Sequence, residues 1–253
     1  MNGFTRENYP QLLAYRNEGL KKYGARFTDE ITRPPSRCFL PAVWSVAKPT
    51  AFPSVAIGPL RVGAAGPSMI LAHEALAKRA QVKVLDIGCA AGMFRDYLLL
   101  RDRSRAIEYV GVDVAPQGGD FPVYASLDEV PGRRFDLIFM SEVAEHMPAD
   151  VFLRDYLAKL PRLMSPQGLA IAGVPNPLAP TVLQRDVTHV QHYPWFDLYA
   201  MFRFFFDDVD VVRTHFIHTP RRLLSLPLRV TFSYFLEMDW CEGITLLARR
   251  PRA

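Results

Sequence analysis

The chain has 253 residues, with 30 Lys or Arg against 26 Asp or Glu, which leaves a formal net charge of +4. Its 49% hydrophobic and 22% charged residues exclude an intrinsically disordered or collagen-like protein. This length predicts one large domain, or one domain with an added segment, with enough core to fold without disulfides. So small an excess of positive charge gives little support to nucleic-acid binding.

Three cysteines, Cys38, Cys89 and Cys241, are too few and too far apart for a disulfide framework or a zinc ribbon. This cysteine usage is typical of a reducing compartment. The N-terminal residues show no uninterrupted apolar stretch of the signal-peptide kind. No run of about 18 apolar residues predicts a transmembrane helix. We therefore expect a cytoplasmic protein.

The first 80 residues differ in texture from the rest of the chain. Residues 1–24 predict one or two short helices. Residues 25–67 predict an extended segment, because the seven prolines between Pro34 and Pro67 are incompatible with long helices. A helix is expected over Pro67 to Ala80. We predict that residues 1–80 form an N-terminal helical and extended cap, and that residues 81–253 form the main domain.

From Val82 onward, short apolar runs alternate with helical patterns, which predicts a parallel sheet with crossover helices. The expected helices are Met93 to Arg101, Ala149 to Leu163, Trp195 to Phe206 and most of Arg221 to Leu236. The fold class is therefore α/β, a doubly wound, Rossmann-like and mostly parallel sheet in which the last strand pairs antiparallel with the sixth. The seven expected strands are Lys83 to Ile87, Tyr109 to Val112, Pro122 to Ala125, Leu137 to Met140, Leu169 to Val174, Val209 to Ile217 and Gly243 to Ala248.

A small-residue turn follows the first of these strands. Gly88 lets the backbone turn and lets a ligand approach, and Gly92 opens a helix whose free N–H groups point outward. Asp113, at the end of the next strand, is placed to accept both hydroxyls of a ribose. The spacing G-x-x-x-G differs from the G-x-G-x-x-G of dinucleotide-binding proteins, which argues against a dinucleotide cofactor.

This turn resembles the first motif of the class I S-adenosylmethionine (SAM)-dependent methyltransferases, usually D-x-G-x-G-x-G, with Ala90 at the place of the middle glycine. Phe135 to Met147 is similar to the fourth-strand motif of that family, and Leu163 to Leu169 is similar to the turn before its fifth strand. Ser126-Leu127-Asp128 occupies the place where the family meets the adenine. The resemblance implies SAM as cofactor, and implies these cofactor-binding residues: Asp86, Gly88, Cys89, Ala90, Gly92, Phe94, Asp113, Val114, Ser126, Leu127 and Ser141.

Glu142, Glu145 and His146 have the spacing i, i+3, i+4, which places them on one side of a helical turn after the fourth strand. Two carboxylates and an imidazole suit Mg²⁺ or Mn²⁺. The pattern is similar to that of metal-assisted small-RNA 2′-O-methyltransferases and ubiquinone-biosynthesis O-methyltransferases, which implies His189 or His192 as a further ligand. The alternative is that no metal binds and that the acids favour the helix dipole.

A second constellation, Asp186 to Tyr193, follows the fifth strand and its turn. It resembles the D-x-T-H-x-x-x-Y segment of bacterial methyltransferases that act on saccharides and secondary metabolites. His189 is the first choice for a general base or ligand, with His146 beside it, because a histidine titrates near neutral pH. The alternative is that Asp186 and His189 only brace the loop.

Together these patterns predict a SAM-dependent methyltransferase that transfers a methyl group in line to a hydroxyl of a small molecule. A sugar, a polysaccharide precursor or a secondary metabolite is the expected acceptor and partner. Two alternatives stay open: a metal-assisted RNA 2′-O-methyltransferase, and a non-catalytic SAM-binding scaffold. The sequence does not predict the oligomeric state.

Overall fold

The computed structural model describes residues 6–24, 67–76, 79–101, 105–115, 120–132, 134–179, 187–214, 228 and 243–252. The predicted extended segment before Pro67, nearly all of the predicted helix from Arg221 to Leu236, and Asp186 lie outside these residues. No helix in the described part of the chain is both long and apolar enough to cross a membrane.

Seven strands form one sheet in the order β3-β2-β1-β4-β5-β7-β6. All neighbouring strands from β3 to β5 run parallel, whereas β7 is inserted antiparallel between β5 and β6. The predicted mostly parallel sheet with an antiparallel last strand is therefore confirmed. The strands are β1 (Gln81–Ile87), β2 (Ala106–Val112), β3 (Val123–Tyr124), β4 (Phe135–Ser141), β5 (Met164–Pro175), β6 (Phe206–Thr214) and β7 (Gly243–Pro251).

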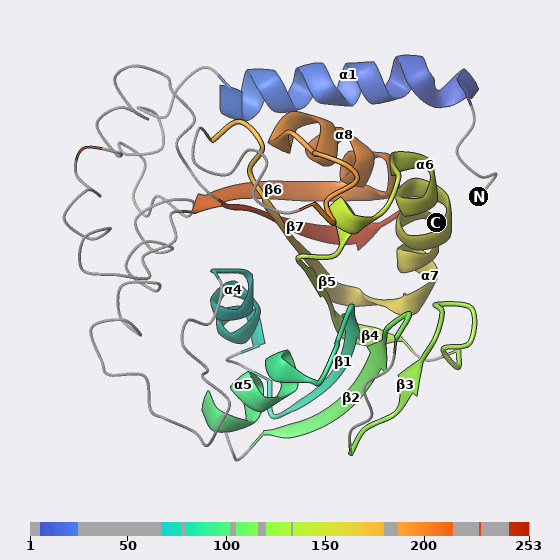
Figure 1. Ribbon diagram of the computed structural model, residues 1–253, viewed down its shortest axis with the longest axis vertical. Helices are drawn as coiled ribbons and strands as arrows, with labels where there is room; N and C mark the ends of the chain where they lie inside the picture. The colour runs from blue at the N-terminus through green and yellow to red at the C-terminus, as the bar shows by residue number, and fades with distance from the viewer. Residues whose placement is uncertain are drawn as a thin grey trace.

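Helices cover both faces of this sheet (Figure 1). On one face lie α4 (Pro67–Leu76) and α5 (Met93–Arg101). The other face is covered by α8 (Trp195–Phe205) and by the helical turns between β4 and β5. Successive side chains of β1 point to opposite faces of the sheet: Val84 packs in the layer of α4 and α5, and Leu85 packs in the layer of α8. This alternation follows from the period of two in a strand.

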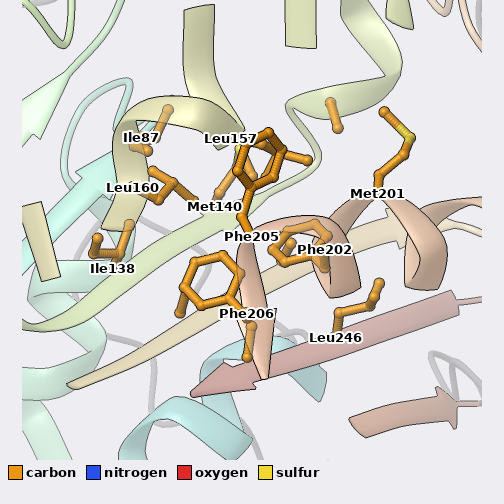
Figure 2. Packing of buried hydrophobic residues seen from close by; sticks show 14 of the residues in the cluster. Ile87, Ile138, Met140, Leu157, Leu160, Met201, Phe202, Phe205, Phe206 and Leu246 are labelled. Carbon is orange, nitrogen blue, oxygen red and sulfur yellow. The ribbon is translucent and has the colours of Figure 1, made fainter. Parts of the chain in front are cut away.

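Large apolar side chains fill the layer under α8 (Figure 2). Phe202 and Phe205 of α8 and Phe206 of β6 are fully buried. Burial of each such ring stabilises the fold by about 1.5–3 kcal/mol. The phenylalanine-rich stretch at the end of α8 is therefore part of the hydrophobic core.

The helical stretch predicted over Ala149 to Leu163 is not one regular helix. It consists of α6 (Ala149–Val151), a π turn (Phe152–Tyr156), a 3-10 turn (Leu157–Lys159) and α7 (Leu160–Leu163). Pro161 has no N–H, and in an uninterrupted α-helix its ring would clash with the carbonyl group four residues earlier, at Leu157. The regular hydrogen-bond ladder therefore breaks in front of α7.

The predicted turn before the fifth strand proves to be an irregularity inside β5. Met164 already pairs with Phe135 of β4, and the register then shifts before Leu169 pairs with Leu137. Between these two pairs, β5 has the four residues 165–168 where β4 has only Asp136. β5 therefore begins five residues earlier than expected.

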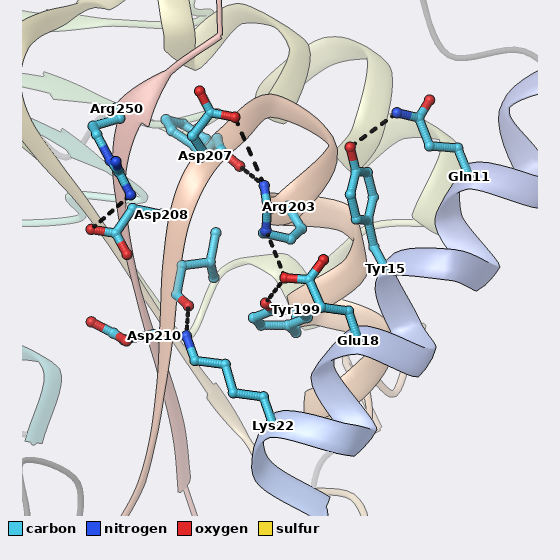
Figure 3. Close-up of polar contacts among 12 residues, drawn as sticks. Gln11, Tyr15, Glu18, Lys22, Tyr199, Arg203, Asp207, Asp208, Asp210 and Arg250 are labelled. Carbon is cyan, nitrogen blue, oxygen red and sulfur yellow. Dashed lines mark hydrogen bonds and ion pairs between the residues drawn. The ribbon is translucent and has the colours of Figure 1, made fainter.

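The N-terminal helix α1 (Tyr9–Gly19), preceded by a 3-10 turn (Arg6–Asn8) and followed by a π turn (Leu20–Gly24), lies along α8 (Figure 1). The close approach depends on Gly19, where a Cβ atom would come within 2.5 Å of the Tyr199 ring. Polar contacts fasten the same interface (Figure 3): the Glu18 carboxylate accepts a hydrogen bond from the Tyr199 hydroxyl (2.7 Å) and one from Arg203 Nε (3.1 Å). Both described helices of the first 80 residues, α1 and α4, thus pack on the sheet domain, and the division at residue 80 stays a prediction.

Candidate functional site

The carboxyl ends of the parallel strands β1, β2, β4 and β5 meet at one edge of the sheet. In open α/β sheets, ligands bind beyond this edge, at the point where the strand order reverses. Here the reversal lies between β1 and β4. The segments that follow these strands contain nearly all of the residues predicted to function.

The turn after β1 departs from ordinary backbone geometry at three positions. The φ angles are +74° at Gly88, +44° at Ala90 and +84° at Gly92. The Gly88 N–H donates to the carbonyl oxygen of Val112 at 2.7 Å, which ties the turn to the end of β2. Ala90 is the only non-glycine residue among the three, at the position where the resemblance anticipated a glycine.

Asp113 follows β2 and reaches back to this turn. Its Oδ2 accepts a hydrogen bond from the Ala90 N–H at 2.8 Å, and its Oδ1 accepts one from the Ala115 N–H at 2.9 Å. A carboxylate oxygen can accept further hydrogen bonds. The half-exposed carboxylate thus fits the hydroxyls of a ribose, and it also organises the turn beside which the ribose would lie.

Asp86, by contrast, is buried on the α5 side of β1, with only 3% of its surface exposed. The Tyr109 hydroxyl of β2 donates a hydrogen bond to its Oδ2. Burial raises the pKa of Asp86 to about 7; the Tyr109 hydrogen bond opposes the rise, and the charge of Asp113 adds to it. Tyr109 was not predicted as a site residue, because sequence reasoning saw it only as the start of an apolar strand.

The other predicted cofactor residues fall into two groups. Cys89, Phe94 and Leu127 are buried, so their side chains belong to the packing around the site. Desolvation also raises the pKa of the Cys89 thiol to about 12, which makes it a poor nucleophile. The exposed fraction of Val114, by contrast, is 82%.

Two predicted serines have local partners. The Ser126 hydroxyl donates to Glu129 Oε1 at 3.2 Å, which closes the turn after β3. The Ser141 hydroxyl, at the end of β4, lies 2.8 Å from the hydroxyl of Ser68 in α4. Gly173 of β5 is needed at this contact, because its Cβ would lie 2.8 Å from the Ser141 oxygen.

Glu142, directly after β4, is also held in a left-handed conformation, with φ = +58°. Its N–H donates to the Gly173 carbonyl oxygen at 2.8 Å. Such strained non-glycine residues cluster at functional sites. Desolvation raises the pKa of Glu142 well above its usual value, and the neighbouring Glu145 carboxyl opposes that rise.

Three predicted residues come together after β4. One ligand atom from each of Glu145, His146 and His189 lies within 4.8 Å of the others, a grouping that can hold a metal ion. The His146 and His189 rings stand edge to face, with centroids 4.9 Å apart. Glu142 is not part of this group, and neither is His192, which is exposed.

The segment 187–194 is docked on the 3-10 turn Ala144–His146 by contacts that the sequence did not indicate. The Gln191 N–H donates to the Glu145 carbonyl oxygen at 3.1 Å. The Tyr193 hydroxyl donates to the Met147 carbonyl oxygen at 3.2 Å. These bonds bring His189 to His146.

His146 Nδ1 lies 3.2 Å from the carbonyl oxygen and 3.2 Å from the hydroxyl oxygen of Thr188. The Thr188 hydroxyl can accept a hydrogen bond from Nδ1 or donate one to it, whereas a carbonyl oxygen only accepts; a hydrogen bond to the carbonyl oxygen therefore places the proton on Nδ1. The lone pair is then on Nε2, which is the form that a proton acceptor or a metal ligand needs.

Comparison with known proteins agrees with this geometry. The chain is similar to a SAM-dependent methyltransferase from Archaeoglobus fulgidus, with 18% identity, a TM-score of 0.51, and coverage of 73% of this chain and 94% of that chain. It is also similar to the small RNA methyltransferase HEN1, with 19% identity, a TM-score of 0.51, and coverage of 73% of this chain but 25% of that chain. At such identities the likeness shows the fold alone.

No curated protein matches the chain significantly. A family profile described as a methyltransferase domain, however, matches residues 60–210, which is more than half of the chain. The turn after β1 and the carboxylate of Asp113 lie within that range, at the edge where this fold binds ligands. The protein therefore belongs to the methyltransferase domain family.

Proposed function

We propose that the protein methylates a hydroxyl group of a small molecule, such as a sugar, a polysaccharide precursor or a secondary metabolite. The observation that carries the proposal is the meeting of His146 and His189, with ring centroids 4.9 Å apart at the carboxyl edge of the sheet. A hydroxyl acceptor needs a group that takes its proton, whereas an unprotonated amine does not.

The cofactor is held, in this proposal, by the turn after β1 and by Asp113. The positive φ angles of Gly88 and Gly92 shape the turn, and the Asp113 carboxylate accepts the ribose hydroxyls. Asp86 acts indirectly, as a buried acid under the turn. Ser126 and Leu127 border the adenine, as the family resemblance implies.

When bound, SAM supplies a methyl carbon that forms a bond to the acceptor oxygen while the electron pair of the broken C–S bond stays on sulfur. The hydroxyl proton moves to an imidazole nitrogen, either His189 or Nε2 of His146. Thr188 holds Nδ1 of His146 and thereby leaves Nε2 able to accept that proton. The docked segment 187–194 orients both rings.

The same group also fits a divalent cation. One carboxylate and two imidazoles suit Mn²⁺, and Mg²⁺ with added water or acceptor oxygens. Glu145, His146 and His189 would be the ligands, with the Glu142 carboxyl beside Glu145. Such an ion would lower the pKa of an acceptor hydroxyl and so ease its deprotonation.

The matched pair His189→Ala and His192→Ala tests the assignment. We expect His189→Ala to lower the methylation rate by about a hundredfold or more with SAM affinity unchanged. His192 is exposed and lies outside the group, so its variant should keep nearly the full rate. Equal effects of the two substitutions would contradict the role of His189.

Chelation tests the ion separately. If the ion takes part, turnover should fall after EDTA treatment and return with Mn²⁺ or Mg²⁺. Unchanged turnover after EDTA would leave Glu142 and Glu145 with a structural role only, and proton transfer to histidine would be the remaining mechanism.

A further inference from the structure

The segments after the carboxyl ends of β1, β2, β4 and β5 carry negative charge. Within their described residues 88–92, 113–115, 120–122, 142–150, 176–179 and 187–194, they contain five carboxylates and neither lysine nor arginine. The acids are Asp113, Asp120, Glu142, Glu145 and Asp150. This local balance contrasts with the +4 net charge of the whole chain.

In the part of the chain that the structure describes, two arginines flank this edge, and each is paired with acidic neighbours. Arg95, in the first turn of α5, forms an ion pair with Asp120 at 2.7 Å. Arg154 forms one with Asp155 at 3.0 Å and a longer one with Asp150 at 3.9 Å. Their positive charge is therefore largely offset by carboxylates.

The same edge exposes large apolar side chains. Val187 is fully exposed and Val190 is 60% exposed, on either side of His189. Leu178, in the turn after β5, is 44% exposed. On the cofactor side, Met93 and Val114 are exposed as well. Apolar surface on the rim of a binding site gains free energy when a ligand covers it.

These two features together select a class of acceptor. A phosphate, sulfate or nucleic-acid strand near Glu142 and Glu145 would be repelled, and recognition of such anions relies on Lys or Arg. One divalent cation held by Glu145 and the two histidines would offset only part of this negative charge. Building on the proposed function, we infer that the acceptor is uncharged where it enters this edge and presents an apolar face to Val187 and Val190.

A matched pair of fluorescent hydroxyl compounds tests this inference: 2-naphthol and its 6-sulfonate. Binding to the full-length protein saturated with S-adenosylhomocysteine is measured by fluorescence titration. We expect 2-naphthol to bind at least about tenfold more tightly, and a short single-stranded RNA to show no salt-sensitive binding. Equal affinities, absence of binding by both naphthols, or tight RNA binding that weakens steeply with salt would overturn the inference.

A charge variant locates the discrimination at this edge. Val190→Lys places a cation beside His189 and should narrow the preference for the neutral naphthol by about threefold or more. Leu13→Lys adds the same charge on α1, where Leu13 is also exposed, and should leave the preference unchanged. Equal effects of the two variants would mean that the discrimination arises elsewhere, which contradicts the inference.

Methyl transfer to the probe is scored separately by mass spectrometry. Preferential binding of 2-naphthol without O-methylation of any hydroxyl acceptor would sink the proposed function and leave the inference on acceptor charge intact. O-methylation of a phosphorylated or sulfonated acceptor in preference to its neutral counterpart would support the proposed function and overturn the inference on acceptor charge.

Discussion

The two halves of the site are built differently. The cofactor half, residues 88–92 with Asp113, is held by hydrogen bonds from the turn to the end of the adjacent parallel strand, which is the next strand in the sequence. The acceptor half, residues 142–146 with 187–193, is assembled by contacts between segments about 40 residues apart in the sequence, such as His146 with Thr188. One half is a local motif, and the other depends on how a distant segment docks.

Because the two halves are built differently, substitutions in one half should affect different measured properties from substitutions in the other. Changes in the cofactor half should alter SAM affinity or the stability of the turn. Changes in the acceptor half should alter turnover while SAM affinity stays the same. Gly88 is the exception, because it contacts Val143 of the acceptor half.

The largest effect is expected for Asp113→Ala. Loss of two charge-assisted hydrogen bonds, each of about 1.5–3 kcal/mol, predicts about a thousandfold weaker SAM binding. The Ala90 N–H also loses its acceptor, but it lies in an exposed environment where water replaces it. Calorimetric titration with SAM measures the effect, and Asp113→Asn, which keeps one acceptor oxygen, should be intermediate. Undiminished affinity would mean that the ribose is bound elsewhere.

Gly88→Ala should be the most destabilising single change where the halves meet. The new Cβ would lie 2.2 Å from Val143 Cγ2, and the backbone has φ = +74°. Overpacking of about 1–3 kcal/mol and left-handed strain of about 1 kcal/mol together predict a loss of about 3 kcal/mol in unfolding free energy. Urea denaturation measures it.

The double variant Gly88→Ala/Val143→Ala separates these causes. Removing the Val143 methyl groups relieves the clash and leaves the backbone strain, so part of the loss should return. If the second substitution restored no stability, the contact between the two halves would not be tight.

The cofactor half was the more predictable part of the site for the same physical reason. Helix α5 begins and ends at the residues expected from the sequence, Met93 and Arg101, because the turn up to Gly92 marks its start. The start of β2 was missed, since the charged Glu108 separates Ala106 and Ile107 from the apolar run on which the expectation rested.

For the acceptor half, the sequence predicted which residues take part but not how they are arranged. Histidines in the right segments were recognisable, with His189 as the first choice and His192 open as a further ligand, and His146 lies beside His189. The sequence did not show what brings His189 to this position, which is the docking of Gln191 and Tyr193 on the turn after β4. No local pattern encodes contacts between segments so far apart.

A smaller effect is expected for Asp86→Asn, which tests the buried acid under the cofactor half. The folded-state pKa of Asp86 is raised to about 7, whereas the unfolded value is about 3.9. The stability contributed by its bound proton is therefore fully present below about pH 4 and is lost as the pH rises through about 7. The asparagine variant stays neutral and still accepts the Tyr109 hydrogen bond. It should be more stable than the wild type at pH 8 and about equal at pH 4.

Urea denaturation of the cofactor-free protein between pH 4 and 8 measures this difference. Tyr109→Phe is the control: it removes the hydrogen bond that opposes the rise, so the loss of stability should extend to higher pH. Parallel pH profiles for wild type and Asp86→Asn would show that Asp86 titrates normally in the folded protein.

The smallest effect concerns the departure from the glycine pattern. Ala90 has φ = +44°, a conformation that costs an L-residue about 1 kcal/mol or more. Ala90→Gly should remove that strain, offset by the greater chain entropy of glycine, and stabilise the protein by about 0.5 kcal/mol. SAM affinity should change by less than about threefold, because the bond to Asp113 comes from the backbone N–H and survives the substitution.

Ala91→Gly provides the matched control, since the neighbouring residue is exposed and has no positive φ. At position 91 there is no left-handed strain for a glycine to relieve, so the substitution should destabilise the folded protein by about 0.5–1 kcal/mol. Opposite signs for the two adjacent substitutions would show that the backbone itself shapes the cofactor half. Equal losses of stability would mean that Ala90 does not adopt the left-handed conformation, and the local account of this half would fail.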